Sequence, residues 1–150
     1  MRPETAPSGN SPHILPLESE IRPLQIVVPH LNPALTAKAL EAAVYLARGF
    51  DAAVILTAVY VLPYPAPLEC QEGIRERMES ELLALARTTP GDVKAKLVFA
   101  RDRETAFCGL LPPRALVVIG TRRHWWPTRE VRFARRLTAA GHSVAVIRVN

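Results

Sequence analysis

Short apolar runs alternate with amphipathic segments along the chain from residue 24 onward. Five runs, most of them rich in β-branched residues, predict strands: Leu24–Val28, Ala52–Tyr60, Val93–Ala100, Ala115–Ile119 and Ser143–Val149. The segments between them carry apolar side chains at helical spacing and predict helices over about Leu35–Arg48, Glu69–Arg87, Arg103–Leu110 and Arg129–Ala140. The expected order is therefore β-α-β-α-β-α-β-α-β.

This alternation decides the fold class. Strands and helices that follow one another with short connections form a parallel sheet covered on both faces, and right-handed crossovers make it doubly wound. We predict an α/β, Rossmann-like fold with a five-stranded parallel sheet in the order 3-2-1-4-5. In the third strand, apolar residues alternate with Lys94 and Lys96. One face of that strand should be solvated, which is typical of a strand near an edge.

Single residues mark where several elements should begin or end. Pro29 cannot donate a ladder hydrogen bond and should close the first strand. Gly49 is a suitable cap for the first helix, and Gly120 should end the fourth strand. Thr128 should cap the start of the last helix, and Gly141 should stop it.

The composition is that of a folded domain, with 49% hydrophobic and 22% charged residues in 150. No apolar run approaches the ~18 residues that span a bilayer, and the first residues lack the apolar segment of a secretory signal. We therefore expect a cytoplasmic protein without membrane association. Residues 1–21 contain four prolines and predict a flexible arm before a domain over residues 22–150. Cys70 and Cys108 lack partner spacing and should be ordinary thiols.

The strand order predicts where a ligand would bind. It places the topological switch between the first and fourth strands, and ligands of such sheets bind outside the carboxyl ends of the strands there. The candidate ligand-binding residues follow these two strands: Pro29, His30, Leu31, Asn32, Gly120, Thr121, Arg122 and Arg123. Arg122 and Arg123 could hold a phosphate or carboxylate through charge-assisted hydrogen bonds, or could simply be solvated.

Positive charge is concentrated in the last third of the chain. The net charge is +5, and residues 101–150 contain ten arginines against three acidic residues. Arg129, Arg132, Arg135 and Arg136 share one face of the last predicted helix. This basic face is either solvated or meets an anionic partner such as an acidic protein. Nucleic acid is not expected there, because no nucleic-acid-binding fold is recognised and no aromatic residues interleave with the arginines.

The aromatic and histidine residues near the switch allow more than one interpretation. Trp125 and Trp126 could stack on a base, but adjacent tryptophans in a loop more often pack on a core or form a subunit contact. His30 and His124 flank the crevice, yet no serine, cysteine or carboxylate pairs with either by sequence. We therefore predict no catalytic residues, and the irregular histidine spacing predicts no metal site.

The last predicted strand would leave an apolar, unprotected edge. Such edges are usually paired or covered. Antiparallel pairing with the same strand of a second copy would protect it by twofold symmetry. We therefore expect a homodimer through this strand, with Val144, Val146 and Arg148 at the edge.

Taken together, residues 24–149 resemble the universal stress protein domain. Leu24–Pro29 is similar to the family's opening strand, Leu35–Leu46 to its first helix, Leu116–Thr121 to its fourth strand with the following glycine and threonine, and Val144–Val149 to its last strand. The resemblance implies a role in stress adaptation or in regulating another protein, and it also implies dimers.

The same resemblance bears on ATP. Members that bind ATP have an aspartate just after the first strand, and a motif of glycine, two residues, glycine, nine residues, glycine and serine or threonine. Here Leu31 takes the aspartate position, Gly120 the first glycine and Arg123 the second, while Phe133 and Ala134 take the last pair. Because side chains fill the space that glycines leave for phosphate, we predict a non-catalytic binding or regulatory module without ATP in the usual mode and without another cofactor.

Two alternatives stay open. One is a nucleotide-binding protein for ATP or AMP, in which the side chains of Arg122 and Arg123 replace backbone contacts and weak ATP hydrolysis occurs. The other is a domain that binds an acidic partner or nucleic acid through Arg129, Arg132 and Arg136 on the last helix.

Overall fold

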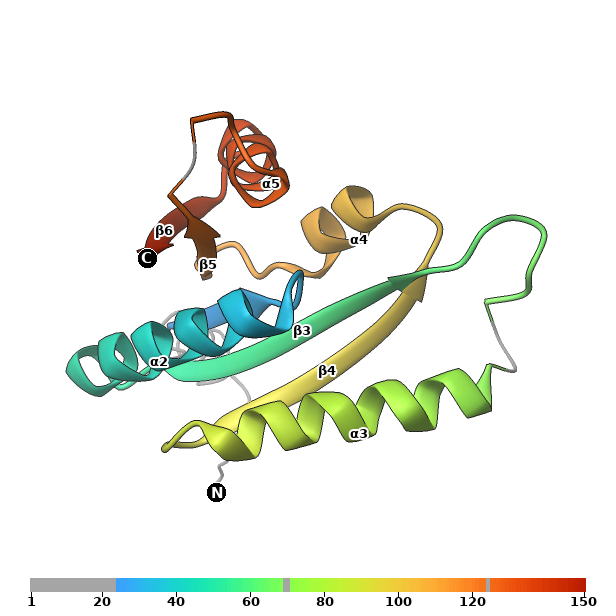
Figure 1. Ribbon diagram of the computed structural model, residues 1–150, viewed down its shortest axis with the longest axis horizontal. Helices are drawn as coiled ribbons and strands as arrows, with labels where there is room; N and C mark the ends of the chain where they lie inside the picture. Colours follow the sequence, from blue (N-terminus) through green and yellow to red (C-terminus); the bar gives the residue numbers. More distant parts are fainter. Residues whose placement is uncertain (1–23, 69–70, 124) are drawn as a thin grey trace, which may run out of the picture.

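The computed structural model describes residues 24–68, 71–123 and 125–150, so the predicted arm over residues 1–21 lies outside the described residues. Strands and helices alternate along these ranges in the predicted order (Figure 1). The elements are β2 (Gln25–Pro29), α2 (Pro33–Phe50), β3 (Ala53–Val61), α3 (Glu72–Thr88), β4 (Val93–Ala100), α4 (Arg103–Leu110), β5 (Leu116–Arg122), α5 (Arg129–Ala139) and β6 (Ser143–Val149).

The five strands form one parallel sheet in the order β4-β3-β2-β5-β6. In chain order this is 3-2-1-4-5, which confirms the predicted topology. β4 lies at one edge, as its alternating pattern predicts. The central strands β2 and β5 pair only at Ile26 with Leu116 and Val27 with Val117. Their carboxyl ends therefore diverge at the topological switch.

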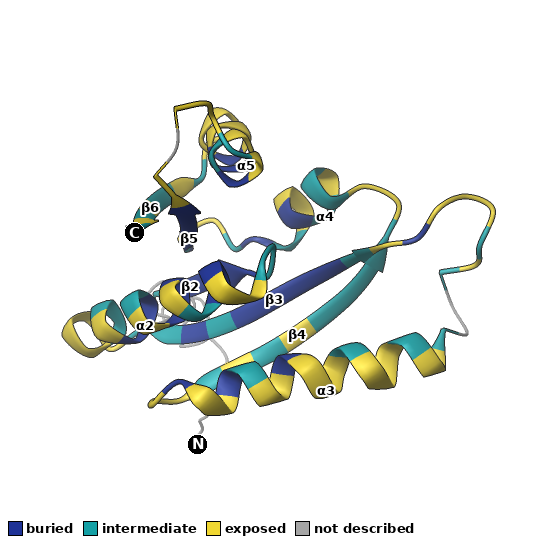
Figure 2. Ribbon diagram, in the orientation of Figure 1, coloured by how far each residue is buried: buried dark blue, intermediate teal, exposed yellow. Residues whose placement is uncertain are grey.

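Two hydrophobic cores cover the two faces of the sheet. On one face, Ile26, Val28 and Leu56 pack against buried residues of α2 and against Leu82 of α3. On the other face, Val27, Val117 and Ile119 pack against Phe107 of α4 and against Phe133, Ala134 and Leu137 of α5. Figure 2 shows the buried positions on β3, on β5 and on the sides of α2 and α5 that face the sheet. Within the described residues, no helix is long and apolar enough to cross a membrane.

The first helix ends later than predicted. α2 continues through Gly49 to Phe50 and is capped by Asp51, whose φ of 51° is left-handed. The prediction of Gly49 as the cap is therefore wrong. Aspartate is one of the few residues other than glycine that adopts this conformation readily.

The fourth strand is also longer than predicted, so the assignment of Gly120 as its end is wrong. β5 continues through Gly120 and Thr121 to Arg122, because β6 pairs with it as far as Arg122 and Val149. Because the backbone hydrogen bonds to β6 continue at Gly120, this glycine keeps the extended backbone conformation of a strand.

The ends of the last helix agree with the sequence. Thr128 caps α5, and its Oγ1 accepts a hydrogen bond from the amide of Val131 at 3.3 Å. The helix stops at Ala139, and Gly141 follows with a φ of 96° that favours glycine. The start of α3 is Glu72, whereas the predicted start at Glu69 lies outside the described residues.

Candidate functional site

Two cavities flank α5 at the end of the sheet where the strands terminate. They share no lining residue. We call the first the arginine cavity: its volume is about 260 Å³, and it lies between α4, α5 and the loop after β2. Its lining consists of Leu31, Asp102, Arg103, Glu104, Arg129, Arg132, Phe133 and Arg136. Four guanidinium groups thus face two carboxylates around one hollow.

The junction between β4 and α4 supplies one wall of the arginine cavity. Asp102 is the N-cap of α4, where its carboxylate accepts hydrogen bonds from the amide of Thr105 at 2.8 Å and from its hydroxyl at 2.6 Å. These two bonds, with a smaller contribution from the charge of Arg136, lower the pKa of Asp102 below its ordinary value. The cap fixes the start of α4 and thereby places Arg103, its first residue, beside α5.

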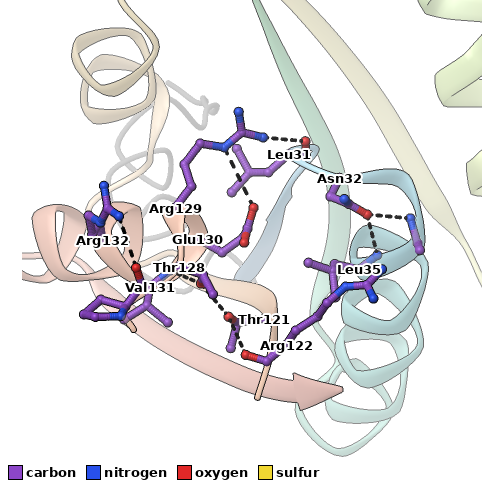
Figure 3. A network of polar contacts seen from close by, with 12 residues as sticks. Leu31, Asn32, Leu35, Thr121, Arg122, Thr128, Arg129, Glu130, Val131 and Arg132 are labelled. Atoms are coloured by element: carbon purple, nitrogen blue, oxygen red, sulfur yellow. Dashed lines mark hydrogen bonds and ion pairs between the residues drawn. The ribbon is translucent and has the colours of Figure 1, made fainter. Parts of the chain in front are cut away.

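Helix α5 supplies the opposite wall. Arg129 donates from Nη2 to the carbonyl oxygen of Leu31 at 3.2 Å, and its Nε lies 3.9 Å from a carboxylate oxygen of Glu130 (Figure 3). Arg132 donates to the carbonyl oxygen of Pro127 at 3.2 Å. Arg136 forms an ion pair with Glu104 of α4. These contacts hold α5 against the loop after β2 and against α4.

Arg103 differs from the other three arginines. Its Nε is buried, and it has no hydrogen-bond partner among the residues that the structure describes. Burial, together with the nearby positive charge of Arg129, lowers the pKa of Arg103, although a guanidinium stays protonated at neutral pH. A buried guanidinium donor without an acceptor carries a desolvation cost, and a bound anion would remove that cost.

The second cavity lies on the other side of α5, and we call it the tryptophan–arginine groove. One part has a volume of about 180 Å³ and is lined by Thr121, Arg122, Arg123, Trp125, Trp126, Pro127, Thr128, Val131, Arg135 and Arg148. An adjoining part of about 460 Å³ shares four of these residues and extends along α5 to Val144 and Val146 of β6.

The structure separates the ligand-binding residues predicted after β2. Leu31 lines the arginine cavity. Pro29 is buried at the end of β2. Asn32 caps α2, where its side-chain oxygen accepts hydrogen bonds from the amides of Ala34 at 3.0 Å and Leu35 at 3.2 Å. A ligand role for these residues stays a prediction.

The predicted residues after β5 lie elsewhere. A Cβ added to Gly120 would be 2.5 Å from the carbonyl oxygen of Leu35, so this glycine lets the first turn of α2 pack on the strand. Thr121 is buried, and its hydroxyl lies 2.8 Å from that of Thr128 (Figure 3). Arg122 and Arg123 are exposed and line the tryptophan–arginine groove.

The basic face of α5 is also divided. Arg129, Arg132 and Arg136 line the arginine cavity, while Arg135 lines the groove. The residues that sequence reasoning missed are Asp102 and Arg103, with Glu104 beside them. They follow the carboxyl end of β4, at the same end of the sheet as the carboxyl ends of β2 and β5 where a ligand was expected, and that position was the available signal.

His30 is half-buried, and its Nδ1 is buried without a hydrogen-bond partner in the described part of the chain. Burial lowers the pKa of His30, and the charge of Glu81 opposes this shift in part. His124 lies outside the described residues. In the ranges that the structure describes, no three histidine, cysteine or acidic side chains could together hold a metal ion. Cys108 is an exposed free thiol, and Cys70 lies outside the described residues.

Two sequence interpretations need correction. Trp125 and Trp126 are 98% and 75% exposed, so they do not pack on a hydrophobic core. Phe133 and Ala134 lie inside α5 and are buried in the core beside Phe107. The motif spacing counted from Gly120 ends at these two residues, but α5 already begins at Arg129. They therefore lie within the helix and cannot occupy positions of a phosphate-binding loop.

Comparison with known proteins supports the fold. No family model matches the chain, and no curated protein sequence matches it. Among solved structures, it is similar to the universal stress protein from Archaeoglobus fulgidus, with a TM-score of 0.61 and 17% identity over 89% of this chain and 98% of that one. A universal stress protein from Archaeoglobus fulgidus in complex with dAMP matches with a TM-score of 0.58 and 18% identity over 85% of this chain and 98% of that chain.

Another match is a universal stress protein in complex with cAMP, with a TM-score of 0.56 and 15% identity over 85% of this chain and 98% of that chain. At these identities the similarity concerns the arrangement of the backbone. It confirms the resemblance that the sequence motifs indicated. The chain has the fold of the universal stress proteins.

Proposed function

We propose that this protein is a non-catalytic binding module whose arginine cavity holds a small phosphate monoester, such as a nucleoside monophosphate, through side chains. The observation that carries the proposal is the buried Nε of Arg103, which has no hydrogen-bond partner among the described residues and lies in a cavity lined by three further arginines. Guanidinium groups form paired, charge-assisted hydrogen bonds with phosphate oxygens.

The size of the cavity favours a small ligand. Its volume of about 260 Å³ is below the usual range of small-molecule sites, roughly 300–1,000 Å³. Two of the solved structures were determined with dAMP, a phosphate monoester, and with cAMP, a cyclic diester, so each of these nucleotides has a single phosphate. A nucleoside triphosphate on a glycine-rich loop is not proposed, because Gly120 is covered by the first turn of α2.

The surroundings of His30 favour a binding role. Its buried Nδ1 has no hydrogen-bond partner among the described residues, whereas a histidine that activates a nucleophile is itself oriented by a third group. We infer that ligand occupancy regulates a partner, and the resemblance to universal stress proteins makes stress adaptation the context that we propose.

Thermal unfolding with AMP, cAMP, ATP and inorganic phosphate tests this function. A ligand at 100 times its dissociation constant adds ~2.7 kcal/mol, which raises the Tm of a domain of this size by several degrees. We expect the monophosphates to raise the Tm and ATP to raise it less.

The matched variants are R103Q/R132Q, which removes two charges from the cavity, and R77Q/R87Q, which removes two charges from the exposed side of α3. The first should abolish the shift and the second should retain it. A Tm that no phosphate compound changes, or an equal shift in both variants, would contradict the proposed function.

A further inference from the structure

The loop between β5 and α5 presents aromatic and basic side chains together. Trp125 and Trp126 are among the most exposed large apolar residues of the described chain, at 98% and 75%. Arg122, Arg123 and Arg135 line the same hollow, with Arg148 from β6. Exposing two tryptophans costs free energy that burial would recover, so this surface is suited to a partner.

The charged residues that line the groove are all arginines. No acidic residue lines either part of it within the described chain. Among the described residues, none of the four lining arginines forms an ion pair with a carboxylate, in contrast to Arg136 in the arginine cavity. An anionic partner would therefore meet guanidinium groups that are not already neutralised.

The geometry points to a single-stranded nucleic acid as the partner, and we propose that the tryptophan–arginine groove binds one. Base stacking on aromatic rings beside a basic groove that follows the phosphates is how proteins hold single strands without reading sequence. The basic face of α5 lacks aromatic residues, but the loop supplies them. An acidic polypeptide would pair with the arginines but has no bases to stack on the indole rings.

This inference does not depend on the phosphate monoester proposed above, because the two cavities share no lining residue. R103Q/R132Q should leave nucleic acid binding unchanged, and changes at Trp125 and Trp126 should leave the AMP-induced shift in Tm unchanged. Failure of one proposal is therefore distinguishable from failure of the other.

Tryptophan fluorescence gives a direct test, because the chain has two tryptophans and both lie in this groove. The full-length protein is titrated with an oligothymidylate of about ten nucleotides, a length within the usual site size. We expect saturable quenching. The logarithm of the binding constant should fall with the logarithm of salt concentration with a slope near −3, which is about −0.7 for each phosphate that the four arginines contact.

Variants followed by the anisotropy of a labelled oligothymidylate assign the residues. W125A/W126A should weaken binding about tenfold or more, because it removes both rings on which bases stack, and W125F/W126F should restore most of it. R122Q/R123Q should halve the salt slope. Y45A removes an exposed aromatic ring from α2, and R77Q/R87Q removes equal charge from α3, so both should bind as the unchanged protein does.

Three results would overturn the proposal: no quenching, equal affinity for duplex DNA of the same length, or equal affinity and quenching with polyglutamate. Equal affinity for duplex DNA would mean that the arginines attract the phosphates and that no bases stack on the tryptophans. Polyglutamate binding of that strength would identify an acidic polypeptide as the partner.

Discussion

At the scale of single residues, Gly120 has a packing role that its place in a ligand motif would not suggest. The resemblance to universal stress proteins assigns it to a phosphate motif. In the structure its missing side chain is where the carbonyl of Leu35 approaches β5. The glycine therefore serves the contact between α2 and the sheet, whatever ligand is bound nearby.

Gly120→Ala should destabilise the protein by about 1–3 kcal/mol, because the new Cβ would lie 2.5 Å from backbone that cannot move as a flexible side chain would. Urea unfolding measures the change. Gly109→Ala in α4 is the matched control, since a Cβ there meets nothing within 4 Å, and it should be neutral or slightly stabilising. Equal midpoints for the two variants would contradict this account of Gly120.

At the scale of elements, α5 is held at its start by a pair of threonines. Thr128 caps the helix through the amide of Val131, and its hydroxyl also meets that of Thr121 on β5. One side chain thus fixes both the helix start and the return of the loop to the sheet. The two cavities on either side of α5 depend on this position.

Thr128→Ala should lower the free energy of unfolding by about 1 kcal/mol, the usual cost of losing an N-cap. Thr128→Ser keeps the hydroxyl and should recover most of that loss. Chemical denaturation followed by circular dichroism makes the comparison. If serine proves as costly as alanine, the methyl group rather than the cap bond stabilises this position.

At the scale of the whole molecule, the two edges of the sheet differ. β4 presents the charged Lys94 and Lys96 on exposed positions, which discourages pairing. β6 at the other edge presents Val146, which is 41% exposed, and has no lysine. This difference supports the homodimer that we propose from the sequence, in which two copies of β6 pair antiparallel.

Light scattering coupled to gel filtration tests the dimer. The unchanged protein should have twice the chain mass of 16.5 kDa, and Val146→Lys should shift it to the monomer, because a lysine on an edge strand opposes pairing. Val61→Lys changes a similarly exposed valine at the end of β3 and should leave the dimer intact. Pairing through β6 would be contradicted if the wild-type protein were monomeric or if the Val146→Lys variant stayed dimeric.

The order of elements and the strand order of the sheet were determined by the sequence itself. The spacing of apolar residues along the chain distinguishes strands such as Val93–Ala100 from helices such as Arg103–Leu110. Because crossovers between parallel strands are right-handed, only a few sheet topologies are then compatible with this order of elements. Local signals also placed Thr128 and Gly141 correctly, because a cap and a left-handed turn depend on neighbouring residues.

Only the tertiary structure decided which arginines lie together. Arg103 and Arg129 come from different helices, and the packing of α4 against α5 brings both into one cavity. Arg136 lines one hollow and Arg135 the other, because successive residues of a helix are rotated by about 100° and α5 lies between the two hollows. Burial and distance between residues far apart in the chain depend on packing, and no local pattern encodes them.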